Sequence, residues 1–219
     1  MRCSTRWSAA VLISSVSFFL AVGLAQTGLT NGGFENGTNP GEAAVLPPGS
    51  TAIDGWTVVG GNVSYVGGRW QHSQGLRSVG LPCGGGISQT FETGPDQEYE
   101  VRFNMAGDPN TLPAVKSLEV SFGSAKRVFT FDTTGRSLGN MGWEARSWVF
   151  APVVDPTITV TFSSPTTGCS TPAVDNVRIT ANDVGVRAHP DVPEPVKKPA
   201  GYGLQATGSG KITLEKVLP

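Results

Sequence analysis

The sequence has few charged residues and few histidines. Asp, Glu, Lys and Arg make up 15% of its 219 residues, and the formal net charge is -1. A chain with so little charge builds no strongly basic surface, so nucleic acid is not expected as a partner. The two histidines leave little room for a histidine-ligated metal site or a histidine-based catalytic triad.

Helical periodicity is also missing. No segment after residue 25 repeats its apolar side chains every 3.6 residues. The chain carries 29 Gly and 16 Pro, and both residue types disfavour the interior of a helix. Ten Phe and five Trp are nevertheless enough to build a core, so the chain is expected to fold rather than stay disordered.

The first 25 residues have the pattern of a secretory signal peptide. Arg2 and Arg6 precede an uncharged run over residues 9–25, which ends in the small residues Gly23 and Ala25. This run is shorter than the roughly 20 apolar residues of a spanning helix. Cleavage after Ala25 is predicted, giving a secreted or cell-surface chain with no transmembrane anchor; the alternative is an uncleaved anchor.

Two cysteines remain after such a cleavage, Cys83 and Cys169. Neither belongs to a CxxC motif, and an exported protein meets an oxidising environment. A disulfide between them is predicted, and the alternative is a pair of buried free thiols.

Ten short segments alternate apolar and polar residues, as strands do when they bury one face. Val101, Phe103 and Met105, for example, alternate with Arg102 and Asn104. The ten segments are residues 56–59, 62–66, 77–81, 86–92, 98–106, 116–122, 126–132, 146–151, 157–163 and 173–180. The pattern predicts an all-β protein with a two-sheet antiparallel jelly-roll sandwich.

The chain is therefore divided into three parts. Residues 1–25 are the signal peptide, residues 26–182 the jelly-roll domain and residues 183–219 a flexible tail rich in Pro and Gly. Within the tail, residues 212–214 have the composition of a short, weak strand.

Several motifs resemble those of the choice-of-anchor C family of bacterial secreted proteins, which is related to the plant cell-wall proteins of domain-of-unknown-function family 642. The matching segments, in family order, are residues 31–37, 49–56, 86–91, 131–135, 140–143 and 175–177. The resemblance implies a galactose-binding-like jelly roll, an extracellular location and, by analogy with the plant proteins, binding to polysaccharide. The Val192–Pro195 segment looks like the opening of a sorting motif, but no apolar run follows it.

Glu35 and Asp175 are the candidate metal ligands. Terminal strands of a jelly roll are commonly neighbours, so the two carboxylates are expected to approach each other. Together with backbone carbonyls they would suit Ca²⁺, which takes six to eight oxygen ligands, and similar sugar-binding jelly rolls carry a structural calcium in this region. The alternative is that Glu35 caps backbone amides and Asp175 binds a turn.

Aromatic side chains in loops are the candidate sugar platforms, because a pyranose ring has an apolar face that stacks on an aromatic ring. Trp70 lies in a polar, Gly-flanked segment, and Trp143 precedes a strand; Tyr65 is the third candidate. The alternative for each is packing in the core. The candidate polar partners in loops are Arg69, His72 and Asp108.

The sequence contains no catalytic motif, since it has neither a GxSxG elbow nor an HExxH pair, and no catalytic residue is assigned. The function predicted is that of a secreted module that binds cell-surface or extracellular polysaccharide and is not an enzyme. Two alternatives stay open: a structural envelope or matrix protein that acts through protein contacts, and a glycan hydrolase.

Overall fold

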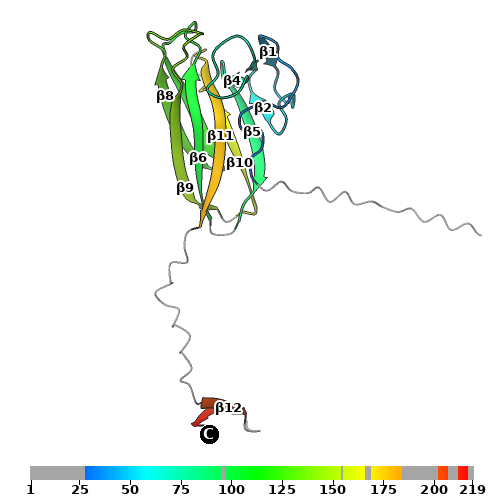
Figure 1. Ribbon diagram of the computed structural model, residues 1–219, viewed down its shortest axis with the longest axis vertical. Coiled ribbons are helices and arrows are strands. Elements are labelled where there is room, and N and C mark those ends of the chain that lie inside the picture. Colours follow the sequence, from blue (N-terminus) through cyan, green and yellow to red (C-terminus); the bar gives the residue numbers. More distant parts are fainter. Residues whose placement is uncertain are drawn as a thin grey trace, which may run out of the picture.

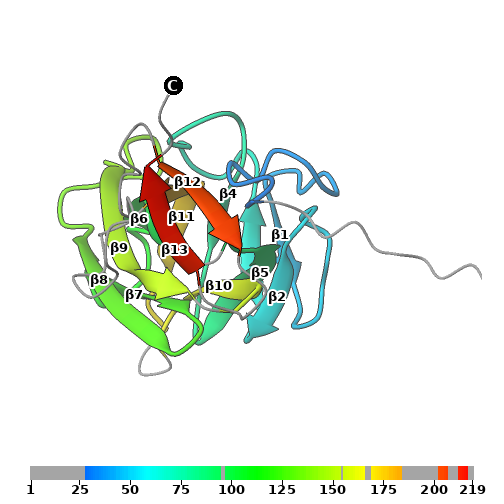
Figure 2. The ribbon, with the colours of Figure 1, turned by 90° about the horizontal axis from the view of Figure 1, so that it is seen from below.

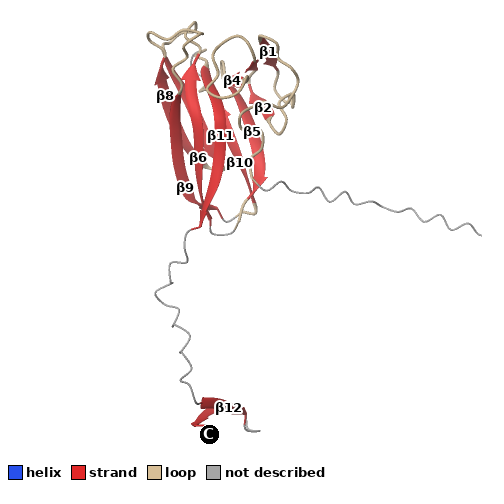
Figure 3. Cartoon of the chain, in the orientation of Figure 1, coloured by secondary structure: helices blue, strands red, loops and turns tan. Residues whose placement is uncertain are grey.

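The computed structural model describes residues 28–94, 97–153, 155–165, 169–183, 202–206 and 212–216. The predicted signal peptide and most of the predicted tail lie outside these residues. The described part consists of strands and loops (Figure 3). It contains no helix with the length and hydropathy needed to cross a membrane.

Within the described residues, eleven strands form two antiparallel sheets. The six-stranded sheet has the order β1-β3-β4-β11-β6-β9, and the five-stranded sheet has the order β2-β5-β10-β7-β8. The first sheet contains β1 (Ala43–Leu46), β3 (Val63–Val66), β4 (Ser78–Gly80), β6 (Gln97–Gly107), β9 (Glu144–Val153) and β11 (Pro172–Asp183). The second contains β2 (Thr57–Gly60), β5 (Gly85–Glu92), β7 (Val115–Phe122), β8 (Ala125–Asp132) and β10 (Thr157–Ser163).

The two sheets lie face to face, as the view along the strands shows (Figure 2). From β4 to β11 the chain crosses from one sheet to the other at every connection except the β7–β8 hairpin. β9, β6 and β11 lie side by side in one layer, and the larger loops gather at one end of the sandwich (Figure 1). The predicted two-sheet jelly-roll sandwich is confirmed.

All ten predicted strands are present. Three further strands are also present, of which two were not predicted and one was predicted only in part. β1 was missed. In the segment predicted as a tail, β12 (Tyr202–Ala206) and β13 (Ile212–Lys216) form a two-stranded antiparallel sheet. The sequence indicated only a short piece of β13.

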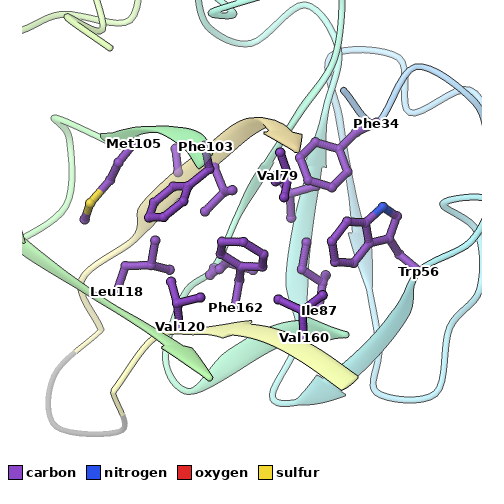
Figure 4. Packing of buried hydrophobic residues seen from close by; sticks show 14 of the residues in the cluster. Phe34, Trp56, Val79, Ile87, Phe103, Met105, Leu118, Val120, Val160 and Phe162 are labelled. Atoms are coloured by element: carbon purple, nitrogen blue, oxygen red, sulfur yellow. The ribbon is translucent and has the colours of Figure 1, made fainter. Parts of the chain in front are cut away.

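The core fills the space between the sheets with side chains from the inward positions of both (Figure 4). Phe103 of β6 meets Phe162 of β10 edge to face, with ring centroids 5.2 Å apart. Trp56 packs on Phe34, with centroids 5.4 Å apart, and both are fully buried. Phe103 and Phe162 come from inward positions of their strands, whereas Phe34 and Trp56 reach the same core from loops.

The Asn31–Gly37 segment is fixed by hydrogen bonds within itself, to the segment before β2 and to β11. The side-chain amide of Asn31 donates to the carbonyl oxygens of Asn36 and Asp54, at 2.8 and 2.9 Å. Gly32 accepts a hydrogen bond from the Val177 amide at 2.8 Å. A Cβ atom at Gly32 would lie 1.9 Å from the Val177 carbonyl oxygen, so only glycine fits at this contact.

The predicted disulfide is confirmed, since Cys83 and Cys169 are bonded. Cys83 lies in the turn between β4 and β5, and Cys169 precedes β11. β4 and β11 are antiparallel neighbours, with Ala173 opposite Gly80, and the disulfide lies just beyond this pair, after the end of β4 and before the start of β11. It therefore links two segments that are 86 positions apart in sequence.

Candidate functional site

A β-bulge in β11 anchors a loop, residues 71–77, over the outer face of the six-stranded sheet. The register of β11 against β6 shifts just after Asp175. One carboxylate oxygen of Asp175 accepts hydrogen bonds from the backbone amide and hydroxyl of Ser73, at 2.9 and 2.8 Å, and from the Gln74 amide at 3.0 Å. The side-chain amide of Asn104 on β6 also donates to the Ser73 hydroxyl at 3.0 Å.

Glu35 holds the second half of the same loop. Its Oε1 atom accepts hydrogen bonds from the amides of Leu76 and Arg77, at 2.9 and 3.1 Å. Gly75 packs against this carboxylate with a φ of +62°, and a Cβ there would lie 2.1 Å from Glu35 Oε1. Two carboxylates from distant parts of the chain thus hold the two halves of one loop, although Glu35 lies outside the strands and β1 is not a neighbour of β11, so terminal-strand adjacency is not what relates them.

Asp175 is fully buried, and its contacts are those of an ionised acceptor. Burial raises the pKa of this carboxyl group, and the hydrogen bonds from Gln74, Ser73 and Asn176 oppose the rise. The second carboxylate oxygen accepts from the Asn176 amide at 2.6 Å.

These hydrogen bonds are the ones expected if Glu35 and Asp175 cap backbone amides. Ca²⁺ would have to compete with N–H donors for the same oxygens, and the described residues contain no group of three or more His, Cys, Asp or Glu placed to hold a metal ion. The hydrogen bonds to these two carboxylates therefore fit amide capping better than calcium binding.

Calcium binding stays a prediction, and thermal denaturation tests it. An ion that binds only the folded chain would stabilise it by about 2.7 kcal/mol at a hundredfold excess over Kd. Calcium would then raise the melting temperature and a chelator would lower it. An unchanged melting curve in both conditions would leave Glu35 and Asp175 with capping alone.

The outer face of the six-stranded sheet carries a groove made of two cavities that share Asn104, each of about 550 Å³. We call this surface the outer-face groove. Its sheet part is lined by Arg102, Phe103, Asn104, Ala145, Arg146, Ser147, Asn176 and Arg178. Its loop part is lined by Gln71, His72, Ser73, Asn104, Arg136, Asn140, Gly142, Trp143 and Glu144.

The sheet part of the groove is set by strand register. Arg102 on β6 lies between Arg178 on β11 and Ser147 on β9. Arg102 forms an ion pair with Glu100 at 2.9 Å, and this contact lowers the pKa of Glu100. The next outward position, Asn104, lies opposite the small side chain of Ala145, so β9 adds little bulk to the floor of the groove.

The loop part of the groove brings together an aromatic and a basic side chain. Trp143 is half-buried against the core, and its indole N–H donates to the Gln71 carbonyl oxygen at 2.8 Å. The guanidinium of Arg136 lies directly on Gly142, where a Cβ would come within 2.4 Å of its central carbon. Gly142 has a φ of +66°, a left-handed conformation that favours glycine over residues with a Cβ.

Two of the predicted platforms are not exposed, which corrects the expectation drawn from the polar segments around them. Trp70 is 4% exposed and donates to the Ser78 hydroxyl at 2.8 Å. Tyr65 is fully buried, and its hydroxyl donates to the Phe34 carbonyl oxygen at 2.6 Å. Burial also raises the pKa of Tyr65. Neither ring has a free face for a sugar, and both pack in the core.

The predicted polar partners serve mainly to hold loops. Asp108 is buried, pairs with Arg69 at 2.9 Å and accepts the Asn110 amide at 2.9 Å. His72 contacts the Ser78 hydroxyl through Nδ1 at 2.9 Å and the Gly67 carbonyl oxygen through Nε2. Only His72, of these three predicted residues, lines the outer-face groove.

Sequence reasoning missed the arginines and amides of the groove. Arg102 and Asn104 appear in the sequence only as polar positions alternating with buried ones. Their outward direction was readable from the period of two, but their neighbours on β9 and β11 depend on the register and the bulge.

A protein-family model matches most of the described chain. The model of a family described as "Protein of unknown function (DUF642)" matches residues 27–180. Halomucin of Haloquadratum walsbyi (strain DSM 16790 / HBSQ001) is 30% identical over 207 residues, which cover 90% of this chain and 2% of halomucin. The chain thus spans a very small part of the curated relative that it matches.

Solved structures with similar sandwiches include two carbohydrate-binding proteins. TmCBM61, solved in complex with β-1,4-galactotriose, is 20% identical with a TM-score of 0.44, over 72% of this chain and 100% of that one. The CBM22-1 xylan-binding domain of Paenibacillus barcinonensis Xyn10C is 16% identical with a TM-score of 0.46, over 72% of this chain and 97% of that one. Likeness at this level does not identify a ligand or a site.

Proposed function

Since the chain belongs to the DUF642 family, whose function is unknown, we propose from its geometry that it is a secreted module that binds polysaccharide in the outer-face groove without cleaving it. The Cys83–Cys169 disulfide supports an oxidising, extracellular location. The signal-peptide pattern of residues 1–25 points to the same location.

The observation that carries this proposal is the chemistry of the groove lining. Side-chain amides of Asn104, Asn140 and Asn176 both donate and accept hydrogen bonds, as sugar hydroxyl groups require. Trp143 adds an aromatic ring at one end. Small-molecule pockets typically measure about 300–1,000 Å³, so the two cavities together suit a few sugar units of a longer chain.

The charges of the groove favour binding over hydrolysis. Glycosidases use two carboxyl groups that face each other across the scissile bond. Glu144 is the carboxylate among the groove-lining residues, and it is paired with Arg146 at 2.6 Å. Arg146 also donates to the Thr130 carbonyl oxygen, so this pair braces β9 against β8.

Replacing Trp143 with alanine should weaken polysaccharide binding about tenfold, because a stacked indole contributes about 1–2 kcal/mol. The wild-type affinity expected for a single module is on the order of 10 μM to 1 mM. Affinity electrophoresis or calorimetry of the mature protein against bacterial and plant polysaccharides measures both, with release of reducing ends assayed in parallel.

Trp143→Phe is the matched control. It keeps an aromatic face but loses the hydrogen bond to Gln71, so it should retain most of the binding if stacking matters and lose it if only loop anchoring matters. Release of reducing ends would assign the protein to the hydrolases. No retention by any glycan, together with capture of a protein partner, would favour the structural alternative.

A further inference from the structure

We infer that the outer-face groove selects polysaccharides that carry anionic groups, carboxylate or sulfate, and that Arg102 and Arg178 are the residues that bind these groups. This inference rests on the proposed function and names its ligand class.

Arg102 and Arg178 are placed directly opposite each other on neighbouring strands. They are paired positions of β6 and β11, and both side chains are exposed. Like charges at directly opposed positions of a sheet repel each other and destabilise it. A bound anion between the two guanidinium groups would remove that repulsion.

The protein neutralises this pair only in part. Glu100 is the ion-pair partner of Arg102, whose side chain stays 66% exposed. Arg178 donates through Nε to the Asn176 side-chain oxygen at 3.2 Å. Within the described residues, no carboxylate lies within ion-pair distance of Arg178.

The space beside the pair fits a sugar ring. Ser147 lies next to Arg102 on β9, and Ala145 lies next to Asn104. These small side chains leave the cavity of about 550 Å³ over β9 and β6. A sugar ring lying there would place its hydroxyl groups at Asn104 and an acidic substituent at Arg102, and guanidinium binds carboxylate and sulfate through paired N–H groups.

The attraction is local, because the chain as a whole is not basic. The formal net charge is -1, so a polyanion is not drawn to the protein by its overall charge. Selective retention of an acidic polymer would therefore report on a particular surface.

The test compares charged polymers with uncharged polymers of the same backbone. Polygalacturonate is compared with its fully methyl-esterified form, and dextran sulfate with dextran, by calorimetry or affinity electrophoresis at two salt concentrations. The variant is Arg102→Gln with Arg178→Gln. The matched control is Lys126→Gln with Arg127→Gln on β8 of the opposite sheet, which also removes two positive charges but outside the groove. Melting temperatures of both variants check that the fold is intact.

We expect the charged polymer of at least one pair to bind about tenfold or more tightly than its neutral counterpart. The groove variant should lose this preference while the β8 control keeps it. Which pair shows the preference separates carboxylate from sulfate. Equal binding of charged and neutral polymers, or equal losses in the two variants, would overturn the inference and leave polysaccharide binding standing. Retention of none of these polymers, nor of any polysaccharide in the bacterial and plant panel, would reject both.

Discussion

Replacing Asp175 with alanine should lower the free energy of unfolding by about 3 kcal/mol, because the loss of a buried charged acceptor leaves its donors unsatisfied. The amides of Ser73, Gln74 and Asn176 all donate to this carboxylate, which is fully buried. Urea denaturation followed by Trp fluorescence measures the change. The 71–77 loop should also become mobile, since Asp175 anchors its first half.

Asp132→Ala is the matched control for this prediction. Asp132 is an exposed carboxylate on β8 that also accepts a backbone amide, from Thr134 at 2.9 Å. Its replacement should change the stability much less. If the two variants were equally stable, Asp175 would not hold the loop in the way that its hydrogen bonds indicate.

Removing the disulfide should lower the free energy of unfolding by more than replacing Asp175 does. A Cys83→Ser, Cys169→Ser double variant should lose about 4.6 kcal/mol of stability, the value of the chain-entropy model for a closed loop of this length. The cysteines are 86 positions apart, so the bond restricts a large part of the unfolded chain. The same urea denaturation, with and without reductant, measures the loss.

The stability of the double variant should be the same with and without reductant. The stability of the wild type should fall to that of the variant when the disulfide is reduced. A wild-type protein whose urea midpoint did not move on complete reduction would show that the bond adds nothing to stability.

The fold was largely predictable because its strands bury one face. Alternation such as Val101–Arg102–Phe103 needs no knowledge of the partner strand. β1 escaped because its sequence, Ala43–Leu46, is apolar throughout and shows no period. The disulfide was predictable because only two cysteines follow the signal pattern.

The site was less predictable, because its parts come from register and burial. Trp70 lies among polar and Gly residues, yet it is buried because its ring packs over Gly80, where a Cβ would lie 2.8 Å from the indole. Glu35 and Asp175 were chosen together on the expectation of neighbouring terminal strands, but Glu35 lies outside the strands, and the two residues are related through the 71–77 loop. The facing of Arg102 and Arg178 depends on the bulge in β11, for which the sequence has no clear signal.

Amide chemical-shift mapping tests the central claim most directly. The ¹⁵N-labelled mature protein is titrated with a polysaccharide fragment that it retains. Binding in the outer-face groove predicts that the largest shifts cluster at Asn104, Gly142 and Ser147, with little change on the five-stranded sheet. Shifts confined to the five-stranded sheet, or none at a saturating concentration of ligand, would contradict a glycan site on this face.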